Sequence, residues 1–234
     1  MTVIVATGMR AEAALLPPGV RAVVGGGDPV RLRALLERAA EGATAVLSFG
    51  IAGGLLADLE PGALVVATRV RAPGGAWPAD SAWSSALVRA SGARFGVVAG
   101  ASAVVAGPDA KRSLRLRTDA MVVDLESAVA AAFAVSRGLP FAVLRAVADT
   151  AAEELPRAAA VGLSRTGRPA PGRVAMALLR RPGELPALVQ VARRSRTALD
   201  SLAKAARNLP QPGGGLHLPA NDAVSTMARR PLPA

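Results

Sequence analysis

The 234-residue chain contains no cysteine and no tyrosine, and histidine occurs once, at His217. The absence of cysteine excludes disulfides, cysteine nucleophiles and thiolate metal sites. A single histidine in a Gly/Pro-rich tail is expected to be solvated, so we expect neither a histidine-based triad nor a histidine-rich metal site. Aromatic residues make up only 3% of the chain, which argues against a nucleic-acid surface built on base stacking. Acid–base chemistry in this protein must therefore come from carboxylates.

Long apolar runs are also missing. No purely apolar stretch of about 18 residues or more occurs, so we expect no membrane-spanning helix. The N-terminus enters a strand-like segment directly, without a basic region and a cleavage site, so no signal peptide is expected. These features predict a cytoplasmic protein, with peripheral attachment to the cytoplasmic face of the membrane as a further option.

Positive charge is concentrated in the C-terminal third of the chain. Residues 1–155 hold 15 Lys and Arg against 14 Asp and Glu, whereas residues 156–234 hold 13 against 3. One interpretation is contact with an anionic surface, either a membrane or a nucleic acid. The other is an arginine-rich composition with a solvated tail, and the sequence leaves both open.

Short apolar runs without polar alternation, interleaved with helix-like segments, dominate residues 1–150. Such strands are buried on both faces and belong to mostly parallel sheets. We therefore expect an α/β fold, a single three-layer domain with a central mixed, mostly parallel sheet flanked by helices, plus a basic helical extension at the C-terminus. Strands are expected at residues 2–6, 20–24, 45–49, 64–70, 95–105, 121–123 and 140–148.

The C-terminal region is expected to differ from this body. We place one globular domain at residues 1–183, a basic amphipathic helix at 184–207 and a disordered tail at 208–234. One face of the helix carries Leu188, Ala192, Ser195, Leu199, Leu202 and Ala206, and the other gathers Arg193, Arg194, Arg196, Lys204 and Arg207. The helix either packs on the body, which is slightly favoured, or lies on a membrane surface.

Four segments follow expected strands, at residues 8–12, 48–55, 123–128 and 145–150. Because ligands of α/β sheets bind beyond the carboxyl ends of strands, these segments are expected to converge on one pocket. Three carboxylates stand out in them, namely Glu12, Glu126 and Asp149. Each one alone is compatible with an ordinary charge at a helix start. Three at such positions favour a functional site.

The content and order of these segments, over about residues 2–150, resemble the methylthioadenosine/S-adenosylhomocysteine nucleosidases and their phosphorylase relatives. The Thr-Gly-Ser-Ala-Gly-Gly motif of that family corresponds to Phe-Gly-Ile-Ala-Gly-Gly at residues 49–54. Its Glu-Met-Glu motif corresponds to Asp-Leu-Glu at 124–126, and its Arg-Ala-Ile-Ser-Asp motif to Arg-Ala-Val-Ala-Asp at 145–149.

Within this superfamily, the chain resembles the hopanoid-associated phosphorylases. The similarity lies in residues 25–28, 48–55, 77–78 and 139–142, and in a basic C-terminal helix preceded by Leu-Pro-Ala-Leu at 185–188. The resemblance implies cleavage of the N-glycosidic bond of an adenine nucleoside, with adenosylhopane as the expected substrate. The alternative is a soluble methylthioadenosine/S-adenosylhomocysteine nucleosidase.

The resemblance also implies roles for individual residues. Asp149 is expected to be the acid that protonates the adenine leaving group. Glu126 is expected to hold the ribose hydroxyls, with Leu125 beneath the sugar. Further contacts to ribose and base are expected from Asp124, Gly53, Ala52, Val104 and Val105.

The nucleophile is left open between phosphate and water. Glu12 corresponds to the family carboxylate that orients water, whereas Gly8, Arg10 and Gly50 are candidates for a phosphate or water site. Two residues depart from the family pattern. Ile51 stands where relatives carry a hydroxyl, and Ala148 stands where they carry a serine that supports the acid.

Partners and cofactors follow from the same resemblance. No metal or redox cofactor is implied, and phosphate is a candidate co-substrate. The expected partners are a lipid-linked small-molecule nucleoside, a membrane surface contacted through the basic helix, and further copies of the chain in a homo-oligomer. A non-catalytic protein that binds nucleic acid is disfavoured by the scarcity of aromatics and the near-neutral body.

Overall fold

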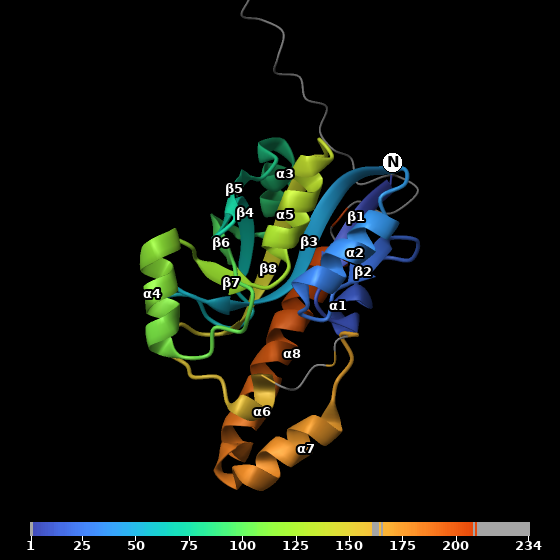
Figure 1. Ribbon diagram of the computed structural model, residues 1–234. Helices are drawn as coiled ribbons and strands as arrows, with labels where there is room; N and C mark the ends of the chain where they lie inside the picture. The colour runs from blue at the N-terminus through green and yellow to red at the C-terminus, as the bar shows by residue number, and fades with distance from the viewer. Residues whose placement is uncertain (1, 161–163, 165, 208, 210–234) are drawn as a thin grey trace, which may run out of the picture.

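The computed structural model describes residues 2–160, 164, 166–207 and 209 (Figure 1). Its strands are β1 (Thr2–Thr7), β2 (Arg21–Val24), β3 (Ala43–Gly54), β4 (Leu64–Ala72), β5 (Gly75–Pro78), β6 (Arg94–Gly100), β7 (Val122–Asp124) and β8 (Phe141–Asp149). Its helices are α1 (Arg10–Ala13), α2 (Pro29–Arg38), α3 (Ser81–Ser91), α4 (Pro108–Thr118), α5 (Ser127–Ser136), α6 (Arg157–Ala160), α7 (Pro171–Arg180) and α8 (Leu185–Arg207). A short 3₁₀ helix, Pro182–Glu184, joins α7 to α8.

All of these strands belong to one mixed, mostly parallel sheet. Strand β1 pairs in parallel with β2 and β3, and β3 pairs in parallel with β8. Strand β4 is antiparallel to β5 and β8 and parallel to β6, while β7 is parallel to β6 and antiparallel to the end of β3. Strand β8 pairs with both β3 and β4, and these two strands are also connected through β7 and β6. The sheet therefore closes on itself.

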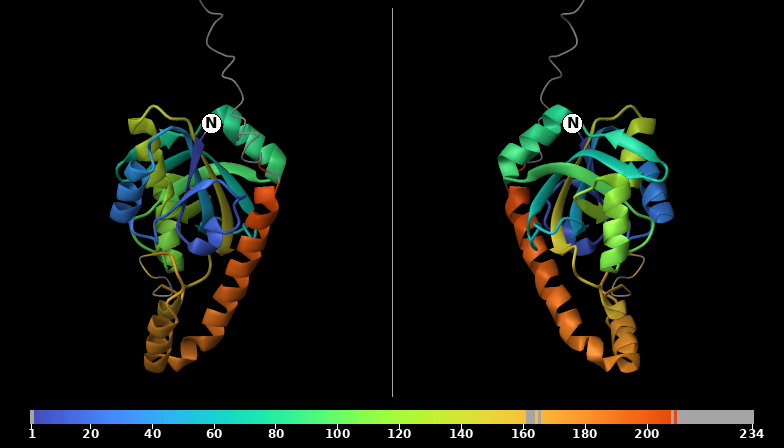
Figure 2. Two further views of the ribbon diagram at one scale, coloured as in Figure 1. Left: turned by 90° about the vertical axis from the view of Figure 1, so that its right-hand side faces the viewer. Right: turned by 90° about the vertical axis from the view of Figure 1, so that its left-hand side faces the viewer.

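Helices cover both faces of the sheet, so its central strands are buried on both sides. Val46 of β3 packs in the cluster that holds α2 and α5, whereas its neighbour Leu47 packs in the cluster that holds α3 and α8. Val143 and Leu144 of β8 divide in the same way. Alternate strand residues point to opposite faces, so two buried faces require the continuous apolar runs seen in the sequence. The expected α/β fold with helices on both sides is confirmed (Figures 1 and 2).

Helices α2 and α3 each start at an aspartate cap. Asp28 Oδ1 accepts the backbone N–H of Arg31 at 3.0 Å, and Asp80 Oδ1 accepts that of Trp83 at 2.8 Å. These bonds satisfy helix donors that otherwise lack partners. The strand expected at 95–105 begins at residue 94 and ends at residue 100.

Helix α4 was not predicted from the sequence. Most of its side chains are charged or polar, and Lys111 is its one buried residue. A helix without an apolar stripe lacks the periodicity on which sequence prediction depends.

Helix α8 has two parts with different surroundings. Its C-terminal half buries Ala198, Leu202 and Ala205 against the sheet, in the cluster that also contains Leu209. Its N-terminal half extends away from the sheet towards the short 3₁₀ helix that joins it to α7, as all three views show (Figures 1 and 2). Packing on the body, the favoured interpretation, therefore holds for the C-terminal half.

Two expectations lie wholly or mostly outside the described residues. These are the solvated position of His217 and the disordered tail at 208–234, of which only Leu209 is described. Among the helices that are described, none is both long enough and apolar enough to cross a membrane.

Candidate active site

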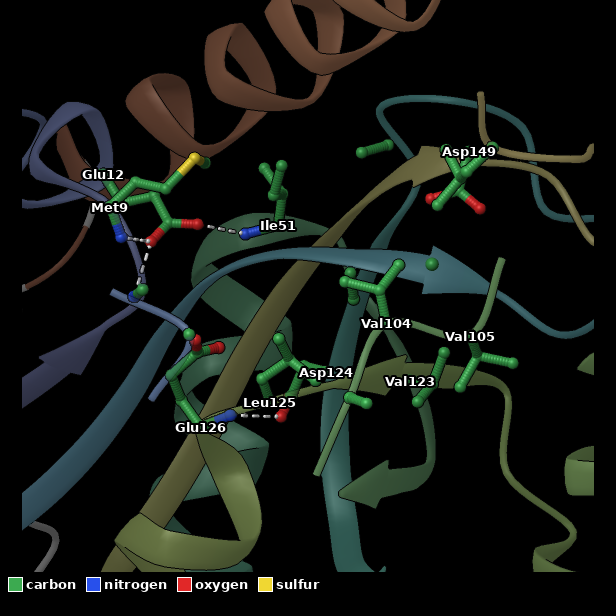
Figure 3. Close-up of a pocket in the computed structure, with 17 residues that line it drawn as sticks. Met9, Glu12, Ile51, Val104, Val105, Val123, Asp124, Leu125, Glu126 and Asp149 are labelled. Atoms are coloured by element: carbon green, nitrogen blue, oxygen red, sulfur yellow. Dashed lines mark hydrogen bonds between the residues drawn. The ribbon is translucent and has the colours of Figure 1, made fainter. Parts of the chain in front are cut away.

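A pocket of about 190 Å³ opens where β1, β3, β7 and β8 end (Figure 3). Ten of the twelve residues singled out in the sequence line it, namely Gly8, Glu12, Ala52, Gly53, Val104, Val105, Asp124, Leu125, Glu126 and Asp149. The wall is completed by Met9, Gly27, Ile51, Ala103, Val123, Ala148 and Leu155. The segments after the strands therefore converge, as the α/β pattern predicts.

Glu12 is held rigidly at one side of this pocket. Its Oε2 accepts the backbone N–H groups of Gly8 and Met9, each at 2.8 Å, and its Oε1 accepts that of Ile51 at 2.8 Å. Burial raises the pKa of the Glu12 carboxyl, although the Arg145 charge and these three N–H groups oppose the shift. The capping geometry at the start of α1 thus turns a helix-start carboxylate inward.

Arg145 lies behind the carboxylates and is fully buried. Its Nε is 2.7 Å from Asp124 Oδ2, and its Nη2 is 3.7 Å from Glu126 Oε2 and donates to Ser48 Oγ at 2.6 Å. Burial disfavours the guanidinium charge, but the surrounding carboxylates, Asp124 first, raise the pKa of Arg145 above its ordinary value. A permanent positive charge therefore holds the acidic cluster together.

Glu126 and Asp124 occupy the turn from β7 into α5. Asp124 Oδ1 accepts the backbone N–H groups of Glu126 at 3.0 Å and Ser127 at 2.8 Å, which fixes the turn. Burial raises the pKa of Glu126 to about 8 against the opposing charge of Arg145, and the charges of Asp124 and Glu12 add to the rise. Glu126 therefore keeps a proton at neutral pH and can both donate and accept hydrogen bonds.

Two glycines leave room for these side chains. A Cβ on Gly8 would lie 2.5 Å from Glu126 Oε1. A Cβ on Gly50 would lie 2.5 Å from Glu12 Oε1 and 2.6 Å from Arg145 Nη1. All three distances are far shorter than van der Waals contact, so any larger residue would displace an ionisable group of the site.

Asp149 lies across the pocket from Glu12 and Glu126 (Figure 3). Its Oδ2 accepts a hydrogen bond from Lys111 Nζ, and Lys111 is itself buried. Burial raises the pKa of Asp149 above its ordinary value, and the charge of Lys111 only partly offsets this. A Cβ on Gly53 would lie 3.4 Å from both carboxylate oxygens, which is ordinary van der Waals contact, so the end of β3 lies directly beside the acid.

A larger groove adjoins the pocket. It has a volume of about 780 Å³ and shares Ala103, Val104, Val105 and Leu125 with the pocket. The rest of its wall is mostly small and apolar, and Arg117 is its one charged residue. A ligand in the pocket therefore has an apolar path leading out along α4.

Two of the predicted site residues lie elsewhere. Arg10 is exposed and does not line the pocket, and its backbone N–H donates to Gly167 O at 3.0 Å. Gly50 lies behind Glu12 and shapes the site indirectly. Arg10 was a candidate because a bound phosphate needs a cation, but the side chain at the first position of α1 is exposed to solvent.

Sequence reasoning gave no role to Lys111 or Arg145. Arg145 belongs to a recognised motif, and a charged residue inside an otherwise apolar strand was a usable signal. Lys111 carried none, since it lies among charged residues on α4 and meets Asp149 only through the fold.

The sequence over residues 20–180 matches the family described as the Phosphorylase superfamily. No curated protein sequence matches the chain. Among solved structures, a methylthioadenosine/S-adenosylhomocysteine nucleosidase of Neisseria meningitidis in complex with methylthio-immucillin-A superposes with a TM-score of 0.65 at 19% identity, covering 88% of this chain and 97% of that one.

Two structures from Helicobacter pylori are comparably similar. Native futalosine hydrolase has a TM-score of 0.63 at 17% identity, covering 89% of this chain and 98% of its own. A mutant nucleosidase with 5'-methylthioadenosine in the active site has a TM-score of 0.62 at 17% identity, covering 89% and 99%. At these identities the likeness establishes the fold.

The class that fold and site define is an enzyme that cleaves glycosyl bonds. The chain belongs to the phosphorylase superfamily, as the match over residues 20–180 shows.

Proposed function

We propose that this enzyme releases adenine from a nucleoside by hydrolysis of the N-glycosidic bond. The observation that carries the proposal is the arrangement of three buried carboxyl groups around one pocket, with Glu12 and Glu126 on one side and Asp149 on the other. Cleavage of a ribosyl–adenine bond develops positive charge on the sugar and negative charge on the base. A site for this reaction needs carboxyl groups beside the sugar and an acid beside the base.

Asp149 has the properties of the acid. It lines the pocket, and burial raises its pKa, so it can keep a proton for the leaving base. Val104 and Val105 line the pocket and supply apolar contacts to the base, in place of an aromatic platform. Glu126 is placed to hold the ribose hydroxyls, with Leu125 against the sugar.

Water is the nucleophile favoured by the contacts of Glu12. A phosphate needs backbone N–H groups or free cations, and the N–H groups of Gly8, Met9 and Ile51 already donate to the Glu12 carboxylate. Arg145 is engaged by carboxylates, and Arg10 lies outside the pocket. Glu12 is thus placed to orient a water molecule and to take its proton.

The adjoining groove supports a nucleoside with a large apolar 5' substituent. Its apolar wall begins at Leu125 and Val104, beside the expected ribose position. Burying apolar groups there is favourable by about 0.8 kcal/mol per methylene. Together with the resemblance to hopanoid-associated phosphorylases, this favours adenosylhopane as the substrate over methylthioadenosine or S-adenosylhomocysteine.

A hairpin of α7 and the N-terminal half of α8 supports contact with an anionic membrane that would hold such a substrate. Four of its apolar side chains are exposed, namely Met176 at 53%, Leu179 at 78%, Leu185 at 52% and Val189 at 42%. Arginines at 180, 181 and 193 are exposed on the same hairpin. Apolar side chains flanked by arginines are typical of helices that lie in the interface of anionic lipids.

The reaction is tested by measuring adenine release from adenosylhopane in detergent and from 5'-alkylthioadenosines of increasing chain length, with and without phosphate. We expect release without phosphate, kcat/KM that rises with chain length, and loss of release in Asp149→Asn. Asp109→Asn, an exposed carboxylate on α4, serves as the matched control. A strict requirement for phosphate would refute water as the nucleophile, and preference for the methylthio compound would refute the lipid-linked substrate.

The membrane contact is tested by flotation with anionic and with neutral vesicles. Leu179→Glu should abolish binding to anionic vesicles, whereas Leu116→Glu, at an equally exposed position on α4 (81%), should not. Equal binding by the two variants would refute the hairpin as the docking surface. We also propose the homo-oligomer that the family resemblance implies; light scattering on the wild type tests it, and a monomeric mass would refute it.

A further inference from the structure

Lys111 is an unusual residue of α4, because lysines are almost never fully buried unless paired. Only 1% of its side chain is exposed, although the helix around it is polar. Lys111 does not line the pocket, so it lies behind Asp149 and out of reach of a bound nucleoside. Its burial therefore calls for an explanation in terms of its partners.

The ammonium group of Lys111 is fully satisfied. It donates to Asp149 Oδ2, to the carbonyl oxygen of Thr150 at 2.6 Å and to that of Glu153 at 3.0 Å. A lysine ammonium has three N–H bonds, so each finds one acceptor. Two of these acceptors lie on the loop after β8, so Lys111 also fastens the segment that carries Asp149.

This contact distinguishes the two oxygens of Asp149. Oδ2 is taken by Lys111, and no hydrogen bond from the described part of the chain reaches Oδ1. Since Asp149 lines the pocket and Lys111 does not, Oδ1 is the oxygen left for a ligand.

We propose that Lys111 is the positioning residue of the acid Asp149, directing its Oδ1 proton to the departing base and stabilising the carboxylate that remains. The proposal rests on the proposed function. In the step, the electrons of the glycosidic C–N bond go to the base, and the Oδ1 proton goes to a base nitrogen. Water forms the new bond to the sugar carbon and gives its proton to Glu12, while Lys111 stays an ammonium throughout.

Other charges also face this group. Arg194 of α8 pairs with Glu153 and, like Lys111, opposes the rise in the pKa of Asp149. Across the pocket lie Glu12, Glu126 and the pair of Asp124 with Arg145. Lys111 is the one charged group among the described residues that makes direct contact with the Asp149 carboxylate.

The test compares Lys111→Met, Lys111→Arg and the exposed control Arg112→Met on the 5'-alkylthioadenosine that the wild type cleaves fastest. Activity requires protonated Asp149, so it falls as the pH rises through the pKa of that residue. Removing the ammonium raises this pKa further, so the alkaline limb of kcat in Lys111→Met should move up by about one to three pH units. The loss of positioning should lower the maximal kcat by about 10²-fold with little change in KM. In Lys111→Arg and Arg112→Met, the alkaline limb of kcat should lie at the same pH as in the wild type.

The outcomes separate this proposal from the proposed function. No adenine release by the wild type overturns both. If the wild type releases adenine but the alkaline limb of kcat lies at the same pH in Lys111→Met, the role of Lys111 alone is overturned. Lys111 is then a purely structural residue.

A substrate-free readout covers the case in which Lys111→Met does not fold. In the wild type, the ¹³C carboxyl resonance of Asp149 should follow the protonation of that carboxyl, and the ¹⁵N chemical shift of the Lys111 ammonium, which keeps its protons, should change with the same midpoint. Independent midpoints overturn the proposal.

Discussion

Replacement of Arg145 by methionine removes the one cation at the centre of the acidic cluster. The guanidinium has no exposed surface and lies 2.7 Å from Asp124 Oδ2 and 3.7 Å from Glu126 Oε2. Removing one partner of a buried ion pair leaves the other charges uncompensated and costs about 3–5 kcal/mol. We expect this loss in the free energy of unfolding of Arg145→Met at pH 8. The control is Arg94→Met, which breaks the ion pair of Arg94 with Asp58. Both of these side chains are at least half exposed, so the free energy of unfolding should fall by only about 0–1 kcal/mol.

The loss in Arg145→Met should depend on pH in a defined direction. Without the guanidinium, the cluster must take up an additional proton on folding, because buried carboxylates repel one another. A folded-state pKa above the unfolded value gives stability at low pH that is lost as the pH rises. The penalty should therefore shrink between pH 8 and pH 5, by about 1.4 kcal/mol per pH unit for each additional proton. Urea denaturation of both variants at several pH values measures this, and a penalty equal at pH 5 and pH 8 would refute the account of Arg145.

Three further predictions concern single side chains. Gly50→Ala forces a methyl group against the Glu12 carboxylate and the Arg145 guanidinium, so the free energy of unfolding measured in urea should fall by about 1–3 kcal/mol. The control is Gly172→Ala, which should be neutral or slightly stabilising because no atom lies near its Cβ. Equal effects of the two substitutions would refute the steric argument. Burial raises the pKa of Glu126 from 4.5 to about 8, so its contribution to stability is fully present below pH 4.5 and is lost as the pH rises to 8. The wild-type Tm should therefore fall from pH 5 to 8, and Glu126→Gln should flatten that fall. Leu202→Ala leaves a cavity at a buried position of α8 and should lower the free energy of unfolding by about 2–5 kcal/mol. Leu179→Ala, at an exposed position of the hairpin, should change this free energy little. Similar losses in the two variants would contradict the division of the helices into buried and exposed parts.

Local features of the sequence determined the fold class and most of the pocket. Apolar runs such as 43–49 and 141–148 are needed wherever a strand is buried on both faces, so they indicate a mostly parallel sheet before any contact is known. Parallel strands place their carboxyl ends along one edge. That rule accounts for Glu12 and Asp149, which follow the parallel strands β1 and β8. Glu126 follows β7, which is antiparallel to β3, so only the pairing of β7 with the end of β3 brings it to the same site.

Contacts between distant segments could not be read in this way. Lys111 and Asp149 are separated by 38 residues, and only the packing of α4 beside β6 and the loop after β8 brings them together. The same holds for Arg145, whose charge is tolerated because β3 and β7 deliver Ser48 and Asp124 to it. Periodicity reports which face of an element is buried, but it does not report what that face meets.

The sequence by itself therefore determined the layers, the edge of the sheet that carries the site, and the carboxylates that line it. Tertiary structure alone decided which amides Glu12 occupies, which oxygen of Asp149 is left for a ligand, and that Arg10 faces solvent. The reason is physical. Burial patterns are local properties of a strand or helix, whereas the environment of a charge depends on groups that distant parts of the chain place beside it.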